Sequence, residues 1–194
     1  MSSPADDDPR QPLLRAIDQL EWLVAVVTPA QLSAPTLLPG WSTRTLISHI
    51  VGDIHRIAYA GEGGRLRDVP AMAGDIADDD WADALRRARD RAAAAWAADA
   101  TLSRRYEMVW GEASGAQALR GVTMELVTHT WDLAQAVRPS AGLDRELGLI
   151  ALTVAHQLAP AEHRDENGLF GPVQPVPDGA GVYDQLAGWL GRKV

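Results

Sequence analysis

The chain has 194 residues, 46% of them hydrophobic, and a formal net charge of −8, which suits a domain with a sizeable core and excludes wholesale disorder. The negative charge and the lack of any basic run argue against nucleic acid and anionic membranes as partners, because both attract positive protein surfaces. There are no cysteines, so any bound metal ion must be held by nitrogen and oxygen atoms.

The ends of the chain carry no targeting signal that we recognise. Residues 1–9 have neither the charged start nor the apolar core of a signal peptide, and no later window approaches the roughly 18 apolar residues of a membrane span. We therefore expect a cytoplasmic protein with a single domain over residues 1–194, of which residues 1–9 are disordered. We expect its partners to be small molecules.

The first predicted helix follows Asp8 and Pro9, which are typical of a helix start. Apolar residues then recur three and four positions apart over about 18 residues, as far as Thr28 and Pro29. The stripe consists of Leu13, Ile17, Leu20, Val24 and Val27. This periodicity predicts a helix with one face in a core.

The second predicted helix has Ser42 as its N-cap, with Trp41 placed to pack back on it. His49 lies within its apolar stripe, where a core histidine bonded to the backbone is the commoner explanation. Asp53, one turn further on, either orients the second ring nitrogen of His49 or is a solvated helix acid. His55 points in another direction because it is six residues from His49.

Residues 61–80 predict a loop, which we expect to be mobile because its glycines match no phosphate-binding pattern. Asp78–Asp80 then predict the N-terminus of a third helix, which runs from Trp81 to Trp96 with both tryptophans in the core. Residues 102–110 extend this region or form a short strand.

The fourth predicted helix contains the most informative pair of residues. Within Gly121–Val137, Glu125 and His129 are four residues apart and share a helix face with apolar side chains. Burying two polar groups there requires a compensating partner, such as a hydrogen-bond network or a cation. An acid at this spacing from a histidine is expected about once by chance in this sequence, so the pair needs a further ligand to be convincing. We expect Arg138–Pro139 to end the helix.

A fifth helix is predicted between Asp144, as its cap, and Pro160. Its inward residues are predicted to be Leu147, Ile150, Ala151, Val154 and Leu158. We expect His156 and His163 to face water, since neither has a partner at helical spacing. Residues 168–181 are rich in Pro and Gly and should run extended over the surface before a last short helix.

Together these elements predict an all-α fold, a four-helix bundle with additional short C-terminal helices. Bundles build metal sites from facing helices, so His49, Glu125 and His129 are predicted to converge on a divalent metal ion. Two histidines and one carboxylate leave a coordination position open, as in catalytic zinc sites. Zinc is our first choice, while nickel, iron and manganese also suit these ligands.

Two motifs carry a family resemblance: P-G-W-S-x-R-x-L-x-x-H, which ends at His49, and H-x-W-D-L-A, which begins at His129. With FGPVQPVPDG near the C-terminus, the chain resembles the DinB-like, mycothiol-dependent maleylpyruvate isomerase N-terminal-type superfamily, and its layout is most similar to a small actinobacterial branch of it. The resemblance implies a bundle whose metal is held by His49, Glu125 and His129, and which activates the thiol of a cosubstrate.

The resemblance also implies a reaction class: a transferase or isomerase in which a small thiol, mycothiol, attacks a small electrophile. The absence of cysteine fits a thiol supplied by a cosubstrate. The alternative is a non-catalytic, regulatory metal-binding or ligand-binding bundle with a closed site. Asp53 or His55 would then supply the fourth ligand.

Three further side chains near the motifs have two interpretations each. Trp41 and Trp131 either line a ligand pocket or, as we favour, pack in the core. Asp132 is predicted, as one option, to pair with Arg44 and so tie together the two helices that carry the metal ligands.

Overall fold

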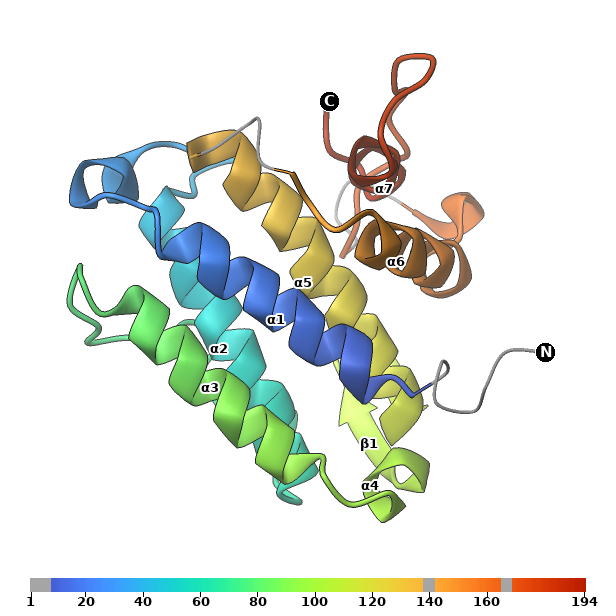
Figure 1. Ribbon diagram of the computed structural model, residues 1–194. Helices are drawn as coiled ribbons and strands as arrows, with labels where there is room; N and C mark the ends of the chain where they lie inside the picture. Colours follow the sequence, from blue (N-terminus) through green and yellow to red (C-terminus); the bar gives the residue numbers. More distant parts are fainter. Residues whose placement is uncertain (1–7, 138–141, 165–168) are drawn as a thin grey trace.

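The computed structural model describes residues 8–137, 142–164 and 169–194, and these fold mainly into helices (Figure 1). Four helices form a bundle: α1 (Arg10–Val24), α2 (Thr43–Gly61), α3 (Trp81–Ala95) and α5 (Gly115–Val137). Both α1 and α2 pack against α3 and α5. The predicted all-α four-helix bundle with additional short helices is confirmed.

Shorter elements connect and follow the bundle helices. They are the 3₁₀ turns η2 (Pro29–Ser33), η3 (Leu66–Asp68) and η4 (Ala161–His163), the helices α4 (Ala100–Ser103), α6 (Arg145–Leu158) and α7 (Val182–Trp189), and the strands β1 (Arg105–Met108) and β2 (Gly111–Ser114). In Figure 1, α6 and α7 lie beside α5 at the edge of the bundle, and α6 packs against both α5 and α7. None of the described helices combines the length and apolar character that a membrane span needs.

The first helix buries most of the stripe that the sequence predicted. The buried residues are Leu13, Ala16, Ile17, Leu20, Leu23 and Val24. The helix ends at Val24, earlier than the predicted end at Thr28, so Val27 is only half-buried beyond it. Asp8 and Pro9 belong to the described chain, and a carboxylate oxygen of Asp8 accepts a hydrogen bond from the backbone N–H of Arg10. Residues 1–7, for which we also predicted disorder, lie outside the described residues.

The second helix begins as predicted. The hydroxyl of Ser42 accepts a hydrogen bond from the backbone N–H of Thr45, which satisfies one of the free donors of the first turn. Its apolar residues are buried on several sides, because the helix packs against both α3 and α5. This burial fixes the rotation of the helix and therefore the direction in which His49 points.

The segment that follows α2 packs back along it. The hydroxyl of Ser48 donates to the carbonyl of Ala73 at 2.6 Å, and the guanidinium of Arg56 donates to that of Val69 at 2.9 Å. A Cβ added at Gly52 would lie 2.5 Å from the carbonyl oxygen of Ala71, so only glycine allows this close approach. The predicted loop is therefore packed against α2 over residues 69–73.

The strand predicted within residues 102–110 is confirmed as β1, which pairs with β2 in an antiparallel hairpin. Tyr106 faces Ala113 across the hairpin, and both are buried. Neither α4 nor β2 was predicted, and α5 begins at Gly115, six residues before the stretch Gly121–Val137 that contains the predicted pair. The turn of the hairpin carries Val109 and Trp110, which line a cavity beside α5.

The C-terminal part confirms the cap of α6 but corrects its inward face. The carboxylate of Asp144 accepts from two backbone N–H groups of the first turn. Leu158, predicted to face inward, is 41% exposed. His156 is exposed as predicted, with its ring against Trp189. The predicted helix end at Arg138–Pro139 and the side chain of His163 lie outside the described residues.

Candidate metal centre

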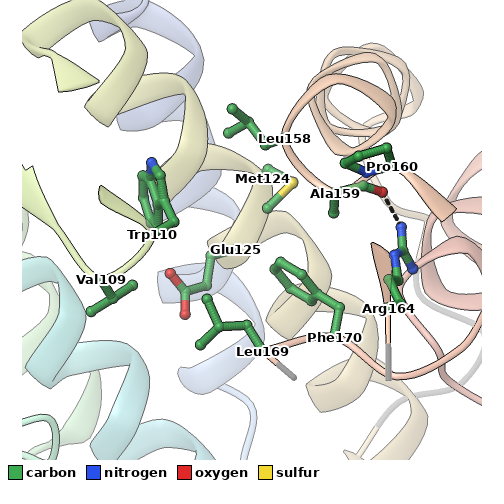
Figure 2. A pocket seen from close by; sticks show the side chains of 10 residues that line it. All are labelled: Val109, Trp110, Met124, Glu125, Leu158, Ala159, Pro160, Arg164, Leu169 and Phe170. Carbon is green, nitrogen blue, oxygen red and sulfur yellow. Dashed lines mark hydrogen bonds between the residues drawn. The ribbon is translucent and has the colours of Figure 1, made fainter. Parts of the chain in front are cut away.

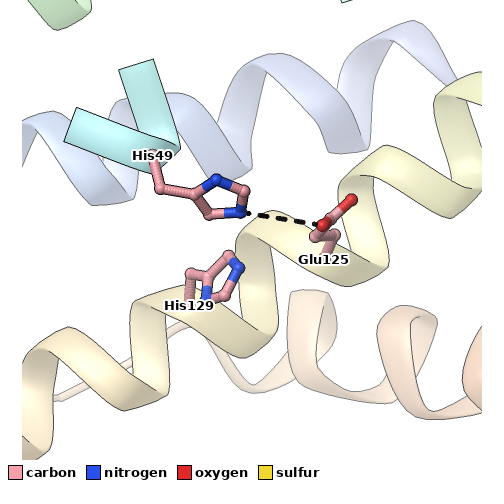
Figure 3. Close-up of side chains that lie close together, drawn as sticks. All are labelled: His49, Glu125 and His129. Carbon is pink, nitrogen blue, oxygen red and sulfur yellow. Dashed lines mark ion pairs between the residues drawn. The ribbon is translucent and has the colours of Figure 1, made fainter. Parts of the chain in front are cut away.

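Three side chains from two helices meet inside the bundle, His49 from α2 and Glu125 and His129 from α5 (Figure 3). One ligand atom of each lies within 4.8 Å of the other two, and the Nε2 atom of His49 is 3.9 Å from Oε1 of Glu125. Ligands of a tetrahedral zinc ion, each about 2.0–2.1 Å from it, are roughly 3.3 Å apart. The observed spacing is slightly wider, and small side-chain rotations would close it.

The position of the cluster follows from helix geometry. Glu125 and His129 share a face of α5 because they are four residues apart. The same face packs against α2, which brings the imidazole rings of His49 and His129 together. Their centroids are 5.0 Å apart, and the angle between the ring planes is 87°. The predicted convergence of the three residues is therefore a feature of the fold.

His129 is held by a side-chain network. Its Nδ1 atom lies 3.0 Å from a carboxylate oxygen of Asp132, which is fully buried and also accepts from the guanidinium of Arg192 at 3.1 Å. Burial lowers the pKa of His129. Burial also tends to raise the pKa of Asp132, but the hydrogen bond from His129 and the charge of Arg192 outweigh it, and the pKa is lowered. A neutral ring with its proton on Nδ1 turns Nε2 toward the cluster.

His49 is held by backbone on one side and faces a carboxylate on the other. Its Nδ1 atom lies 3.2 Å from the carbonyl oxygen of Ala71, and its Nε2 atom lies 3.0 Å from Oδ2 of Asp53. Burial lowers the pKa of His49, but the carboxylates of Asp53 and Glu125 outweigh it, so the pKa is raised. The contact with Asp53 lacks hydrogen-bond geometry, and that oxygen is buried without a hydrogen-bond partner among the described residues.

Glu125 is the third member of the cluster. Its side chain is 32% exposed and opens into a groove. Burial of the carboxylate raises its pKa to about 7, and the negative charge of Asp53 adds to this effect. The charged form of Glu125 therefore needs a nearby positive charge at neutral pH.

These atoms fit a divalent cation. Two imidazoles have their Nδ1 atoms held by a carboxylate and a carbonyl, as is usual for histidines that bind metals through Nε2. The Glu125 carboxylate and the unpartnered oxygen of Asp53 add negative charge that a cation would compensate. His55 does not contribute, because its ring lies beside Arg91 on another side of α2.

The cluster opens into a groove of about 370 Å³, and a second cavity of about 260 Å³ adjoins it. The groove is lined by Leu38, Pro39, Trp41, His49, Glu125, Thr128, His129, Leu169, Phe170 and Arg192. Glu125, Leu169 and Phe170 line both spaces, so the two are neighbours across these three side chains (Figure 2). A small molecule in the groove would therefore reach the cluster directly.

Comparison with known proteins identifies the family. The model of the mycothiol maleylpyruvate isomerase N-terminal domain matches residues 13–134, which include all three residues of the cluster. The chain belongs to this family. Two uncharacterised proteins of Mycobacterium tuberculosis, from strains CDC 1551 / Oshkosh and ATCC 25618 / H37Rv, are each 32% identical to it over 191 residues, which is 96% of this chain and 99% of each relative.

Solved structures agree on the fold. Crystal structures of the mycothiol-dependent maleylpyruvate isomerase and of a histidine-to-alanine mutant of it match with TM-scores of 0.58 and 0.59 and identities of 17% and 16%. Each match covers 79% of this chain and 70% of the solved chain. At this identity the likeness concerns the fold alone, and the predicted family resemblance, with its DinB-like bundle, is confirmed.

Within this family member, the residues around the cluster correct several predictions. The predicted pair of Asp132 and Arg44 is wrong, since Asp132 bonds His129 and Arg192 while Arg44 bonds Asp78. Asp53 is 8% exposed, so it is not a solvated acid. It faces Nε2 of His49, the ring nitrogen that also faces Glu125, and not the second ring nitrogen.

The two tryptophans of the motifs differ in role. Trp41 lines the groove, with its ring centroid 5.1 Å from that of His49, and it is also partly buried against the core, so both interpretations hold for it. Trp131 is 3% exposed, and its indole N–H donates to Asp184, so core packing is right for it. The sequence analysis missed Arg192 altogether. The spacing of His129 and Asp132 was the only signal that could have found this network.

Proposed function

We propose that this protein binds a divalent metal ion through His49, Glu125 and His129 and uses it, with mycothiol, in a transferase or isomerase reaction on a small electrophile. The observation that carries the proposal is the convergence of two imidazoles and one carboxylate at a groove. Membership of a family named for a mycothiol-dependent isomerase supports the choice of thiol. Zinc suits these ligands best, and nickel, iron and manganese are the other candidates.

A cation at this place would supply one kind of chemistry: it would lower the pKa of a thiol in the groove, so that the thiolate forms at neutral pH. The other contributions come from residues of the chain itself. Asp132 and the Ala71 carbonyl keep both Nδ1 atoms protonated and both Nε2 atoms toward the groove. Trp41 and Phe170 line the groove with apolar surface, which limits water beside the reacting groups.

The two reaction types differ in what happens after the sulfur attacks. In a transfer, a sulfur–carbon bond forms and the leaving group departs with its bonding electrons. In an isomerisation, the thiol adds across a double bond, the remaining single bond rotates, and elimination restores both the double bond and the free thiol. Because the chain has no cysteine, the sulfur comes from a cosubstrate in either case.

A second candidate is a metal-binding or ligand-binding protein without catalysis. One observation favours it: Oδ2 of Asp53 lies 3.0 Å from Nε2 of His49 and has no hydrogen-bond partner among the described residues. If this oxygen completed the coordination of the ion, no position would be left for a thiol. The site would then bind its metal without activating a cosubstrate.

The test is thiol consumption by the metal-loaded protein with a panel of thiols and electrophiles, including mycothiol, maleylpyruvate and a chlorinated arene. Glu125→Gln keeps the shape of the side chain but removes its charge, and we expect it to abolish turnover. Glu112→Gln, on the exposed hairpin, is the matched control and should behave like wild type. Metal-loaded protein that binds no thiol and shows no turnover across the panel would favour the non-catalytic candidate.

A further inference from the structure

The cavity next to the candidate metal centre has mainly apolar walls (Figure 2). These come from four parts of the chain: α5, the turn of the β1–β2 hairpin, the end of α6 and the segment after residue 168. The lining residues are Val109, Trp110, Met124, Glu125, Leu158, Ala159, Pro160, Arg164, Leu169 and Phe170. Its volume of about 260 Å³ is just below the usual range of about 300–1,000 Å³ for ligand pockets, so its occupant is small.

The shape of this cavity depends on close packing at α5. A Cβ added at Gly121 would lie 2.5 Å from the indole of Trp110, so the glycine allows that ring to rest on the helix. Around the cavity, Val109, Leu158 and Leu169 are 58%, 41% and 67% exposed. Large apolar side chains gathered at one concave place mark a binding site more often than scattered ones do.

One charged side chain of the cavity, that of Arg164, is held by backbone carbonyls. The guanidinium of Arg164 donates to the backbone carbonyls of Ala159, Gly171 and Trp189, and its Nε atom is buried without a hydrogen-bond partner. It forms no ion pair with any described residue. In Figure 2, Phe170 separates this group from Glu125. The guanidinium also lies over the ring of Trp189, 5.1 Å from the ring centroid. Among the described residues, Arg164 therefore brings a positive charge without an acidic partner to one side of an apolar space.

We propose that this cavity binds the apolar body of a small monocarboxylate, with the carboxylate toward Arg164 and the other end toward Glu125. This inference rests on the proposed function in one respect: it names the class of the electrophile, an apolar carboxylic acid that reacts at the end away from its carboxylate.

Binding is measured on the protein as purified, without any thiol, by NMR of methyl-¹³C methionine. Met124 lines the cavity, whereas Met72, which is 39% exposed, does not and serves as the internal control. Octanoate should shift the Met124 signal and leave that of Met72 in place. Octanol and octylamine should each bind at least about tenfold more weakly, a difference of about 1.4 kcal/mol.

A matched pair of variants on α6 locates the site. Leu158 and Leu149 are both 41% exposed, but only Leu158 lines the cavity. Leu158→Asp should weaken octanoate binding at least about tenfold by placing a negative charge at the cavity, while Leu149→Asp should stay close to wild type. Neither residue belongs to the candidate metal cluster, so metal content should be unchanged in both variants.

Three results would overturn the inference: no response of Met124 to octanoate, equal weakening by both aspartate variants, or octanol binding as tightly as octanoate. The outcome is separable from that of the proposed function, because no thiol is present and no turnover is measured. Octanoate binding with no thiol reaction in the panel would keep the cavity and remove the proposed reaction.

Discussion

The two histidines of the candidate metal centre are supported in different ways. His129 donates to the buried Asp132, which is also bonded to Arg192, so every charge in that network has a partner. His49 is held by the backbone carbonyl of Ala71, and on its other side Asp53 has a buried oxygen without a hydrogen-bond partner. The surroundings of His129 are complete within the protein. Those of His49 include a buried carboxylate oxygen, Oδ2 of Asp53, whose charge a cation would neutralise, while the other oxygen of Asp53 lies 3.7 Å from the guanidinium of Arg56.

This difference indicates that the two sides would contribute to metal binding in different ways. A satisfied network keeps its geometry without a ligand, so His129 would be a fixed ligand for an ion bound at this place. An unsatisfied carboxylate costs free energy until a cation arrives, so the surroundings of Asp53 favour metal binding. The predictions below test whether the two sides differ in this way.

The largest effect is expected for Asp132→Asn, which leaves the guanidinium of Arg192 without its carboxylate in a buried place. We expect a loss of roughly 2–4 kcal/mol in unfolding free energy, because breaking a buried pair from one side leaves the other charge uncompensated. The melting temperature should fall by about 5–15 °C. A fall of less than about 2 °C would show that the network on α5 is not tightly coupled.

Metal removal should have the next largest effect. If the ion binds the folded protein only, at a concentration about a hundredfold above its dissociation constant, chelation removes about 2.7 kcal/mol of stability. Helical content should remain, because the bundle has a large apolar core of its own. Circular dichroism before and after chelation measures both quantities, and complete loss of the helical signal would instead make the metal a structural requirement.

Gly52→Ala should disturb the α2 side alone. The added Cβ would lie 2.5 Å from the carbonyl oxygen of Ala71, so the loop must move and His49 loses its orienting partner. We expect about 1–3 kcal/mol of destabilisation, as is usual for overpacking, together with weaker metal binding. Gly74→Ala is the control, because nothing lies within 4 Å of a Cβ at that position. Equal metal affinity in both variants would mean that the Ala71 contact does not matter.

The smallest effect on stability is expected for Asp53→Asn. In the metal-free protein the change should be within about 1 kcal/mol of neutral or slightly stabilising, because the buried Oδ2 of Asp53 lacks a hydrogen-bond partner and its Oδ1 makes only a 3.7 Å ion pair with Arg56. This is the opposite of the result expected for Asp132→Asn, although both are buried acids beside a histidine. Similar destabilisation in the two variants would contradict the division between the two sides.

Local patterns were enough to predict the bundle and the meeting of the three side chains. Apolar residues at helical spacing define the faces of α1, α2 and α3, and the spacing of Glu125 and His129 puts both on one face of α5. These features depend on residues a few positions apart. They can therefore be predicted without knowledge of the tertiary structure.

The surroundings of the cluster could not be predicted in the same way. Asp132 was assigned to Arg44, because the sequence does not show that the segment after α7 brings Arg192 to the same place. The Ala71 carbonyl comes from an irregular loop whose docking depends on Gly52. The adjoining cavity is likewise built largely from turns, such as the one that carries Trp110, where no periodicity exists to be read.

The most direct test of the account is the metal content of the purified protein, measured by inductively coupled plasma mass spectrometry. Wild type should carry about one divalent ion per chain, and His49→Ala and His129→Ala should each retain less than about a tenth of it. His156→Ala, at an exposed position on α6, is the control and should match wild type. Equal metal content in all four proteins, or none in wild type after growth with added zinc, would contradict the central claim.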